Sequence, residues 1–260
     1  ALVSSAITRT LQILDSLVAS VSAAADSAVL DEAVRSGVCE LPDAHGTAPS
    51  TPEEFFAGVR VGPAHIHAGL DVIRVAETEQ LMTAIDVSRN VVIAAPSGTG
   101  KSTLLWRAAA LFENRELVVR VLRVASVADV SVLTRYVRQL HPSESRPVVV
   151  CVDDLGRDAT AAWPEARDRL LEIAHVKVLG ACRQEDFTPL IASGATVVGA
   201  ELHSESARLI YERMTESGLS MAVAVEEAVE RASGLLMEFI AVATTGQRIR
   251  DVLGGQLQAL

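Results

Sequence analysis

The sequence predicts an α/β fold in which a three-layer parallel sheet is preceded by a helical segment and followed by a small all-helical domain. From about Val72 onward, short apolar runs alternate with helical segments, which is the pattern of parallel strands joined by crossover helices. Residues 148–152 are all apolar, as expected of a strand that is buried on both faces of a sheet. After Leu202 the strand pattern ends, and the remaining segments have only helical periodicity.

The positions of prolines and glycines divide the chain into four units. Residues 1–40 are rich in small apolar residues and lack a turn signal, so we expect a helical N-terminal segment. Three prolines and a glycine fall in the twelve residues from 41 to 52, so residues 41–68 are predicted to be a linker or loop. The α/β domain is then assigned to residues 69–201, and the helical domain to residues 202–260.

Each element of the two domains follows from an apolar run or a helical period. Five short apolar segments are predicted as the strands of the sheet: 91–94, 117–124, 148–152, 176–181 and 195–200. Helices are expected between the strands at 101–114, at 127–140 and from Pro164, since proline is favoured in the first turn of a helix. In the C-terminal domain, helices that end near glycines are expected at 204–217, 221–233 and 235–245.

Composition and charge limit the classes of partner. Hydrophobic residues make up 49% of the 260 residues, and the net charge of −10 argues against broad nucleic-acid binding, which needs a positive surface. The three cysteines are odd in number and far apart; Cys151 lies in a valine run and Cys182 follows another apolar run, so we expect both to be buried thiols in a reducing, cytoplasmic compartment. No apolar run reaches the length of about 18 residues that a membrane span needs. The chain begins with Ala rather than Met, which is compatible with processing or with a fragment of a longer protein.

The most specific motif is APSGTGKS, between the first strand and the first helix of the α/β domain. Its glycines allow the backbone to turn around phosphates, so that successive N–H groups and the helix N-terminus face the anion. The lysine reaches the β- and γ-phosphates, and the following hydroxyl binds magnesium. The usual first glycine is replaced by alanine, and the competing interpretation is a glycine turn with an exposed lysine. The motif predicts a P-loop for ATP and Mg²⁺, formed by Ala95, Pro96, Ser97, Gly98, Thr99, Gly100, Lys101, Ser102 and Thr103, with Ser102 as a metal ligand.

Two carboxylates directly follow the third predicted strand. Burying charged groups at such a position is unfavourable unless they are paired or functional. We expect Asp153 to hold magnesium, directly or through water. We expect Asp154 to be the base that orients or deprotonates the attacking water. The alternative for Asp154 is a cap on the following turn.

An arginine, Arg183, follows the fourth predicted strand. Residues beyond the carboxyl ends of parallel strands line the ligand crevice, so Arg183 is expected to contact the γ-phosphate. The alternative is an ion pair on the surface with Glu185 or Asp186. With Lys101 and Asp154, Arg183 completes the candidate catalytic set.

These elements, in this order and followed by a helical domain, resemble the STAND branch of the AAA+-like P-loop ATPases, which includes the NACHT and NB-ARC proteins. The resemblance covers about residues 70–245. It implies that Ile73 and Arg74 contact the base and the ribose of the nucleotide, and that residues 202–209 form the first helix of a lid. Leu236 stands where the family has a proline that packs on adenine.

The resemblance also implies a function. In this family, nucleotide exchange or hydrolysis switches the chain between a closed monomer and an assembled oligomer, and flanking effector and sensor domains give the output. We therefore expect a slowly hydrolysing ATP-dependent switch in signalling or in bacterial antiphage defence. The alternatives are a small-molecule kinase, a DNA-handling AAA+ ATPase, and a module that binds nucleotide without hydrolysis. No second basic cluster is placed for a kinase acceptor, and the acidic balance argues against DNA.

Overall fold

The computed structural model describes residues 28–29, 31–40, 51–249 and 251, and its centre is a sheet of five parallel strands. The strands are β1 (Asn90–Ala95), β2 (Leu117–Val121), β3 (Val148–Leu155), β4 (Val176–Arg183) and β5 (Thr196–Val198). Their spatial order is β2-β3-β4-β1-β5, so β4 lies between the strand that precedes the phosphate loop and the strand that ends in the paired acids. The carboxyl ends of these three strands meet at one edge of the sheet, where a ligand crevice is expected. The predicted α/β class is confirmed.

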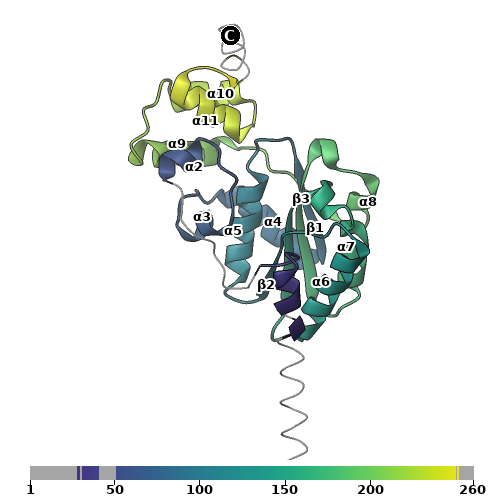
Figure 1. The fold of residues 1–260 in the computed structure, drawn as a ribbon. Coiled ribbons are helices and arrows are strands. Elements are labelled where there is room, and N and C mark those ends of the chain that lie inside the picture. Colours follow the sequence, from purple (N-terminus) through teal and green to yellow (C-terminus); the bar gives the residue numbers. More distant parts are fainter. Residues whose placement is uncertain (1–27, 30, 41–50, 250, 252–260) are drawn as a thin grey trace, which may run out of the picture.

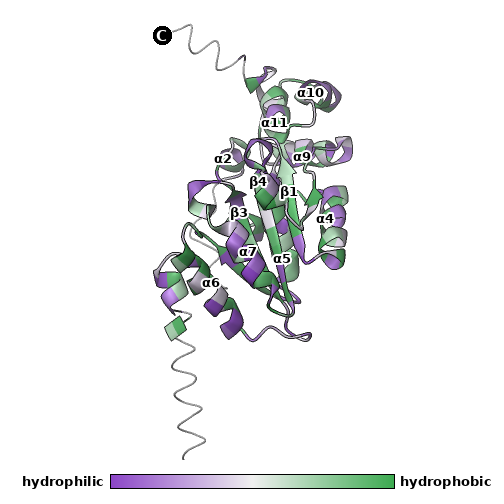
Figure 2. Ribbon diagram, turned by 90° about the vertical axis from the view of Figure 1, so that its right-hand side faces the viewer, coloured by the Kyte–Doolittle hydropathy of each residue, from purple (hydrophilic) through white to green (hydrophobic). Residues whose placement is uncertain are grey.

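Helices cover both faces of the sheet (Figure 1). On one face, α4 (Val75–Val87) and α5 (Lys101–Phe112) pack through a buried cluster that includes Leu81 and Leu105. On the other face, α6 (Val127–Gln139) and α7 (Trp163–Leu171) pack through Leu133, Trp163 and Leu170. Figure 2 shows largely hydrophobic strands among helices that carry both hydrophobic and hydrophilic residues. The sheet and its two helical layers are the three layers that the sequence predicts.

The apolar run in β3 is buried on both sides. Val148, Val150 and Val152 belong to the cluster on the α6–α7 face, whereas Val149 and Cys151 belong to the cluster on the α4–α5 face. Successive side chains of a strand point to opposite faces. A central strand that is covered on both faces therefore needs an apolar residue at every position.

The C-terminal helical domain, here called the lid, has its own core. It consists of α9 (Ser204–Glu216), α10 (Val225–Ala232) and α11 (Leu236–Thr245), as predicted in number and order. Its core includes Ala207, Met214 and Phe239. The helix α10 begins later than the predicted residue 221, because the Ala222 N–H donates to Ala243 O (2.7 Å), a bond across the lid instead of a helical bond.

Two strands are shorter than the sequence predicts. β2 ends at Val121 because the next N–H groups leave the sheet: Leu122 N–H donates to Val38 O (2.8 Å) and Val124 N–H to Ala159 O (2.7 Å). β5 contains three residues, which pair with β1 alone. The remaining short helices of this domain are α8 (Pro189–Ala192), η1 (Asp158–Thr160) and η2 (Gln184–Asp186).

Two short helices, α2 (Pro52–Phe56) and α3 (Pro63–His67), form where the sequence predicts a linker or loop. A capping box starts α2: Glu54 N–H donates to Thr51 Oγ1 (3.3 Å), and Thr51 N–H donates to the Glu54 carboxylate (3.0 Å). Pro52 and Pro63 occupy the first turns of their helices, where a missing N–H removes no helical bond. Pro52 is one of the prolines that favoured a loop in the sequence. Phe56 is buried in the core of the lid, so the segment packs firmly on a folded domain.

The described part of the N-terminal segment lies along the edge of the sheet. Residues 28–29 and 31–35 are helical, and the rest of the predicted helical segment, residues 1–27, lies outside the described residues. Cys39 forms an antiparallel bridge with Val121 of β2. This contact covers the edge of the sheet at β2, which would otherwise expose unpaired backbone groups.

All three cysteines are buried, as predicted for Cys151 and Cys182. Cys39, Cys151 and Cys182 are free thiols, and burial raises the pKa to about 12 for Cys39 and Cys151 and to about 11 for Cys182. In the part of the chain that the structure describes, no helix has both the length and the hydropathy of a membrane span.

Candidate nucleotide-binding site

The phosphate loop connects β1 to α5 at the carboxyl edge of the sheet. Gly98 and Gly100 have φ angles of 80° and 86°, in the left-handed region that favours glycine. A Cβ at Gly100 would lie 2.7 Å from Leu236 Cδ2 and 3.1 Å from Arg74 Nη1. The left-handed backbone therefore favours glycine at position 100, and a larger residue would also have to displace the Leu236 side chain.

Lys101 begins α5 and is 9% exposed. Its Nζ donates to Pro96 O within the loop at 2.7 Å. Burial is the main reason that the pKa of Lys101 is lowered; the negative charges of Glu185 and Asp153 oppose this effect, and the positive charge of Arg183 reinforces it. A phosphate at the loop would give this ammonium a charged partner in place of a neutral carbonyl, and such hydrogen bonds are stronger.

The two acids lie at an irregularity in the sheet. The register between β3 and β4 shifts between Val152 and Leu155, and Asp154 there has a φ angle of 54°. Burial raises the pKa of Asp153, against the effect of a hydrogen bond with the side chain of Ser102. A hydroxyl and a carboxylate in hydrogen-bond contact offer two hard oxygen ligands, which magnesium prefers. The structure thus brings together the two residues predicted as metal ligands.

The Asp154 carboxylate faces the cavity rather than the turn that follows. The following turn bonds to the backbone of Asp154 and not to its side chain: Thr160 Oγ1 donates to Asp154 O at 3.0 Å. The carboxylate instead forms an ion pair with Arg60, with 3.2 Å between Oδ2 and Nη2. These contacts favour the functional interpretation of Asp154 over a cap, and its role as a base stays a prediction.

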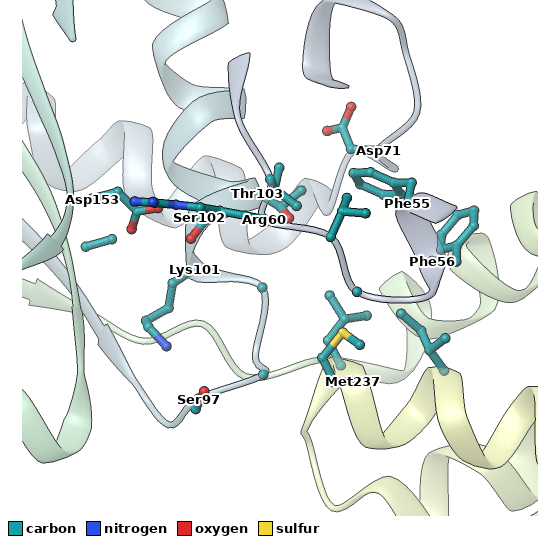
Figure 3. A pocket seen from close by; sticks show the side chains of 18 of the residues that line it. Phe55, Phe56, Arg60, Asp71, Ser97, Lys101, Ser102, Thr103, Asp153 and Met237 are labelled. Atoms are coloured by element: carbon teal, nitrogen blue, oxygen red, sulfur yellow. The ribbon is translucent and has the colours of Figure 1, made fainter. Parts of the chain in front are cut away.

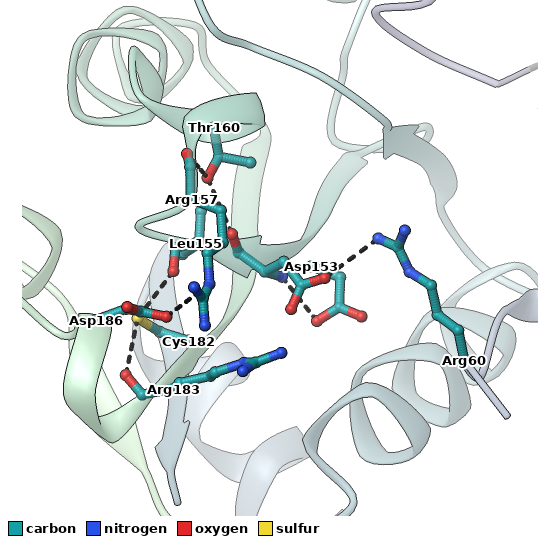
Figure 4. A network of polar contacts seen from close by, with 9 residues as sticks. Arg60, Asp153, Leu155, Arg157, Thr160, Cys182, Arg183 and Asp186 are labelled. Atoms are coloured by element: carbon teal, nitrogen blue, oxygen red, sulfur yellow. Dashed lines mark hydrogen bonds and ion pairs between the residues drawn. The ribbon is translucent and has the colours of Figure 1, made fainter. Parts of the chain in front are cut away.

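Arg183 ends β4 and lines the cavity beside the phosphate loop. Of its two alternative partners, Asp186 is paired with Arg157 (2.9 Å), and Figure 4 shows the Arg183 side chain directed away from Asp186. Within the described residues, no ion pair holds the Arg183 guanidinium. The side chain is therefore available for an anion in the cavity.

A cavity of about 520 Å³ unites these residues, and its volume lies in the usual range for small-molecule sites. Its two ends differ in chemistry, as Figure 3 shows for Lys101, Ser102 and Asp153 at one end and Phe55 and Met237 at the other. The charged end is lined by the phosphate loop, both acids, Arg60 and Arg183. The apolar end is lined by Phe55, Phe56, Val72, Ile210, Leu236, Met237 and Ile240.

The predicted phosphate-loop residues do not all reach the cavity. Its lining includes Ser97, Gly98, Gly100, Lys101, Ser102 and Thr103. Ala95, Pro96 and Thr99 are not among the lining residues, but Pro96 O accepts hydrogen bonds from Lys101 Nζ and from Thr99 Oγ1 (3.0 Å). These residues act on the shape of the loop.

The lid contacts the phosphate loop directly. Met237 N–H, at the start of α11, donates to Gly98 O at 2.8 Å. Leu236 packs against Gly100 and lines the cavity, at the place where the family has its proline. The cavity is therefore formed between the α/β domain and the lid.

The two residues that the resemblance assigns to base and ribose lie differently. Ile73 is 48% exposed and is not among the lining residues. Arg74 lines the cavity, but its guanidinium donates to three backbone carbonyls and pairs with Glu77. Contact of either residue with a nucleotide stays a prediction that the site geometry does not favour.

Sequence reasoning missed Phe55, Phe56 and Arg60. All three lie in the segment predicted as a linker, and the structure brings them to the cavity. The capping box formed by Thr51 and Glu54 is a local signal that could have revealed α2. Nothing local could have revealed that this helix packs on the lid.

The donor set and shape of the cavity fit a nucleoside triphosphate with magnesium. The charged end has a glycine loop at a helix N-terminus, a lysine ammonium and a hydroxyl–carboxylate pair, which suit a polyphosphate and a divalent cation. The apolar end has the aromatic and aliphatic side chains that suit a flat base. Fold and site together define a P-loop nucleotide-binding ATPase.

A family model described as Novel STAND NTPase 5 matches residues 53–194, and this chain belongs to that family. The predicted STAND resemblance is thereby confirmed. The match begins inside α2 and ends after α8, so it includes the two helices of the predicted linker and stops before the lid.

Three solved structures are similar to this chain. A Walker-type ATPase of Pyrococcus abyssi has a TM-score of 0.50 and 14% identity, over 78% of this chain and 79% of that chain. The RuvB Holliday junction branch migration motor of Thermotoga maritima has a TM-score of 0.45 and 17% identity, over 72% of this chain and 64% of that chain. A katanin structure has a TM-score of 0.46 and 12% identity, over 76% of each chain. This chain thus spans less than two thirds of the RuvB chain, and the likeness to the Pyrococcus ATPase concerns the fold alone. No curated protein matches the sequence.

Replacing Asp153 with Ala should weaken the magnesium-dependent part of ATP affinity, because one of the two predicted metal ligands is lost. Calorimetric titration of ATP with magnesium and with a chelator measures this part directly. Asp158→Ala, an exposed carboxylate of the nearby η1, is the matched control and should bind as the wild type does. An unchanged magnesium effect in Asp153→Ala would exclude this residue as a ligand.

Proposed function

We propose that this chain is a cytoplasmic switch of the STAND type, which binds ATP with magnesium, hydrolyses it slowly and associates with other copies in one nucleotide state. The observation that best supports this is the backbone contact between lid and phosphate loop, from Met237 N–H to Gly98 O (2.8 Å). A ligand that changes the loop also changes the contact that positions the lid, which is how domain closure responds to ligands. The role in signalling or antiphage defence, with flanking effector and sensor domains, follows from the family resemblance.

The residues at the charged end have separate tasks in this proposal. Loop N–H groups and Lys101 donate to phosphate oxygens, while oxygens of Ser102 and Asp153 hold magnesium. Bound magnesium supplies positive charge that balances the phosphates. Asp154 accepts a proton from water as the bond from the water oxygen to the terminal phosphorus forms and the bond to the ADP oxygen breaks.

A switch needs a group that interacts with one nucleotide and not with the other. A ligand that binds two conformations equally shifts nothing between them. We assign this task to Arg183, whose guanidinium would contact the terminal phosphate of ATP and would have no such partner in ADP. The lid would then move about the hinge, residues 200–202 between β5 and α9.

Replacing Arg183 with Ala should preserve ADP binding and abolish the difference between the ATP and ADP states. The measurement is hydrogen exchange across residues 195–245 with ADP and with a non-hydrolysable ATP analogue, together with sedimentation for association. The control is Arg169→Ala on α7, a half-buried arginine paired with Glu165 at 2.6 Å. Identical protection and identical mass of the wild type in both nucleotides, with binding confirmed, would exclude a switch and leave a fixed-nucleotide module.

A further inference from the structure

A buried ion pair lies where the phosphate loop, the hinge and the lid meet. Arg74 and Glu77 are one helical turn apart at the start of α4, and their side chains are 3% and 2% exposed. Nη2 of Arg74 is 3.0 Å from Oε1 of Glu77, and its Nε donates to the same oxygen at 3.1 Å. A buried ion pair contributes little net stability compared with apolar residues of the same size. The role of Arg74 and Glu77 must therefore be sought in the groups that they contact.

Arg74 binds the loop and the hinge with one guanidinium. Nη1 donates to Thr99 O in the phosphate loop at 2.9 Å. Nη2 donates to Ala200 O at 3.1 Å and to Glu201 O at 2.7 Å, two carbonyls of the hinge. Because a guanidinium is planar and rigid, these acceptors must keep a fixed mutual geometry while all the bonds persist.

Glu77 extends the same network into the lid. Its Oε2 accepts from Ser206 Oγ at 3.0 Å, and its Oε1 accepts from His203 N–H at 3.4 Å, both at the start of α9. Burial alone would raise the pKa of Glu77, but the charge of Arg74 and hydrogen bonds with the Glu77 backbone, Ser206 and Arg74 hold the pKa below its usual value. The carboxylate is therefore ionised and fully bonded when the lid is in this position.

The loop is thus held from two sides. Thr99 O is bound by Arg74, and the preceding carbonyl, Gly98 O, is bound by Met237 N–H of the lid. The peptide after Thr99 leads into Gly100, which has a left-handed backbone and touches Leu236. Because a peptide unit is planar, a phosphate held by the N–H groups of these peptides also fixes the two carbonyls, and with them the bonds to Arg74 and to the lid.

We propose that Arg74 and Glu77 form a latch that positions the lid according to the conformation of the phosphate loop and thereby sets nucleotide affinity. The latch deepens the proposed function, on which it rests for its link to ATP. Arg74 and Glu77 are then positioning residues: they act on the nucleotide through the Thr99 carbonyl and through the lid, and touch no reacting atom.

The test removes the bond on the lid side and observes the loop. Ser206→Ala deletes one hydrogen bond to Glu77 and leaves Arg74, Glu77 and the loop sequence intact. In the nucleotide-free protein, hydrogen exchange should quicken about tenfold in the first turn of α9 and also in residues 97–105, where Leu104 N–H donates to Gly100 O (3.0 Å). The control Ser217→Ala removes a hydroxyl that caps the end of α9 by donating to Arg213 O (2.8 Å), and it should leave the loop unchanged.

A second variant and a second readout separate the latch from a merely structural role. Glu77→Gln keeps the size of the side chain but removes its charge, and should quicken exchange in both regions as Ser206→Ala does. In both variants, ATP affinity should fall by the same factor by which ATP protection of the lid falls, because coupling between two sites is reciprocal.

The outcomes distinguish the latch from the proposed function. Faster exchange confined to α9, with residues 97–105 as in the wild type, would overturn the latch even if the wild type binds ATP. The variants could instead show faster exchange in both regions while the wild type binds no nucleotide. That result would keep the latch as a link between loop and lid and would overturn the proposed function.

Discussion

Replacing Lys101 with Ala should abolish the thermal stabilisation that ATP and magnesium give to the wild-type protein. The wild type should gain about 2.7 kcal/mol when free ATP is at 100 times its Kd. Lys101 is the ammonium at the phosphate loop, and its present acceptor, Pro96 O, is a neutral group that a phosphate oxygen can replace. Melting curves with ATP, with ADP and without nucleotide measure the effect.

The chain offers a matched control for this change, since its lysines are Lys101 and Lys177. Lys177 lies in β4 and pairs with Glu116 at 3.3 Å, away from the cavity lining. Lys177→Ala should melt lower than the wild type but keep the full response to ATP. An equal response in Lys101→Ala, or none in the wild type at millimolar ATP, would refute the assignment of the loop.

Replacing Asp154 with Asn should lower the rate of hydrolysis by about 10²- to 10⁴-fold, the usual contribution of a general base, while ATP affinity stays near that of the wild type. The amide keeps the size of the side chain and an oxygen acceptor, but it cannot take a proton from water. Phosphate release gives the rate, and calorimetric titration gives the affinity.

The combination of the two readouts identifies the role of Asp154. A loss of rate without a loss of affinity means that the carboxylate interacts in the transition state and not in the ground state. Asp158→Asn, in the exposed η1 nearby, should change neither quantity. If Asp154→Asn hydrolyses ATP at the wild-type rate, Asp154 is not the base and has only a structural role at the irregularity in β3.

The charged half of the cavity could be predicted from the sequence because its causes are local. The glycines at 98 and 100 and the lysine after them form one short motif, and the loop takes the left-handed angles that such a motif requires. The acids could be found because they end an all-apolar strand. Parallel strands bring these separate motifs to one edge of the sheet, so the order of motifs was enough to place them together.

The other half could not be predicted because it depends on contacts between distant parts of the chain. Phe55 follows a proline that favours a loop, and only the packing of α2 against the lid turns it toward the cavity. Arg74 was assigned to the nucleotide, but its acceptors include the carbonyls of residues 200 and 201, which lie far away in the sequence. A sequence pattern shows that an arginine is present and does not show which carbonyls surround it.

The two ion pairs that flank the cavity differ in their access to solvent. The side chains of Arg60 and Asp154 are 84% and 37% exposed, whereas those of Arg74 and Glu77 are 3% and 2% exposed. Dissolved ions screen exposed charges over a Debye length of about 8 Å at physiological ionic strength, and they screen buried pairs far less. Added salt therefore weakens the attraction between Arg60 and Asp154 more than that between Arg74 and Glu77. Ionic strength thus acts on the charged end of the cavity separately from the hinge, without any change of sequence.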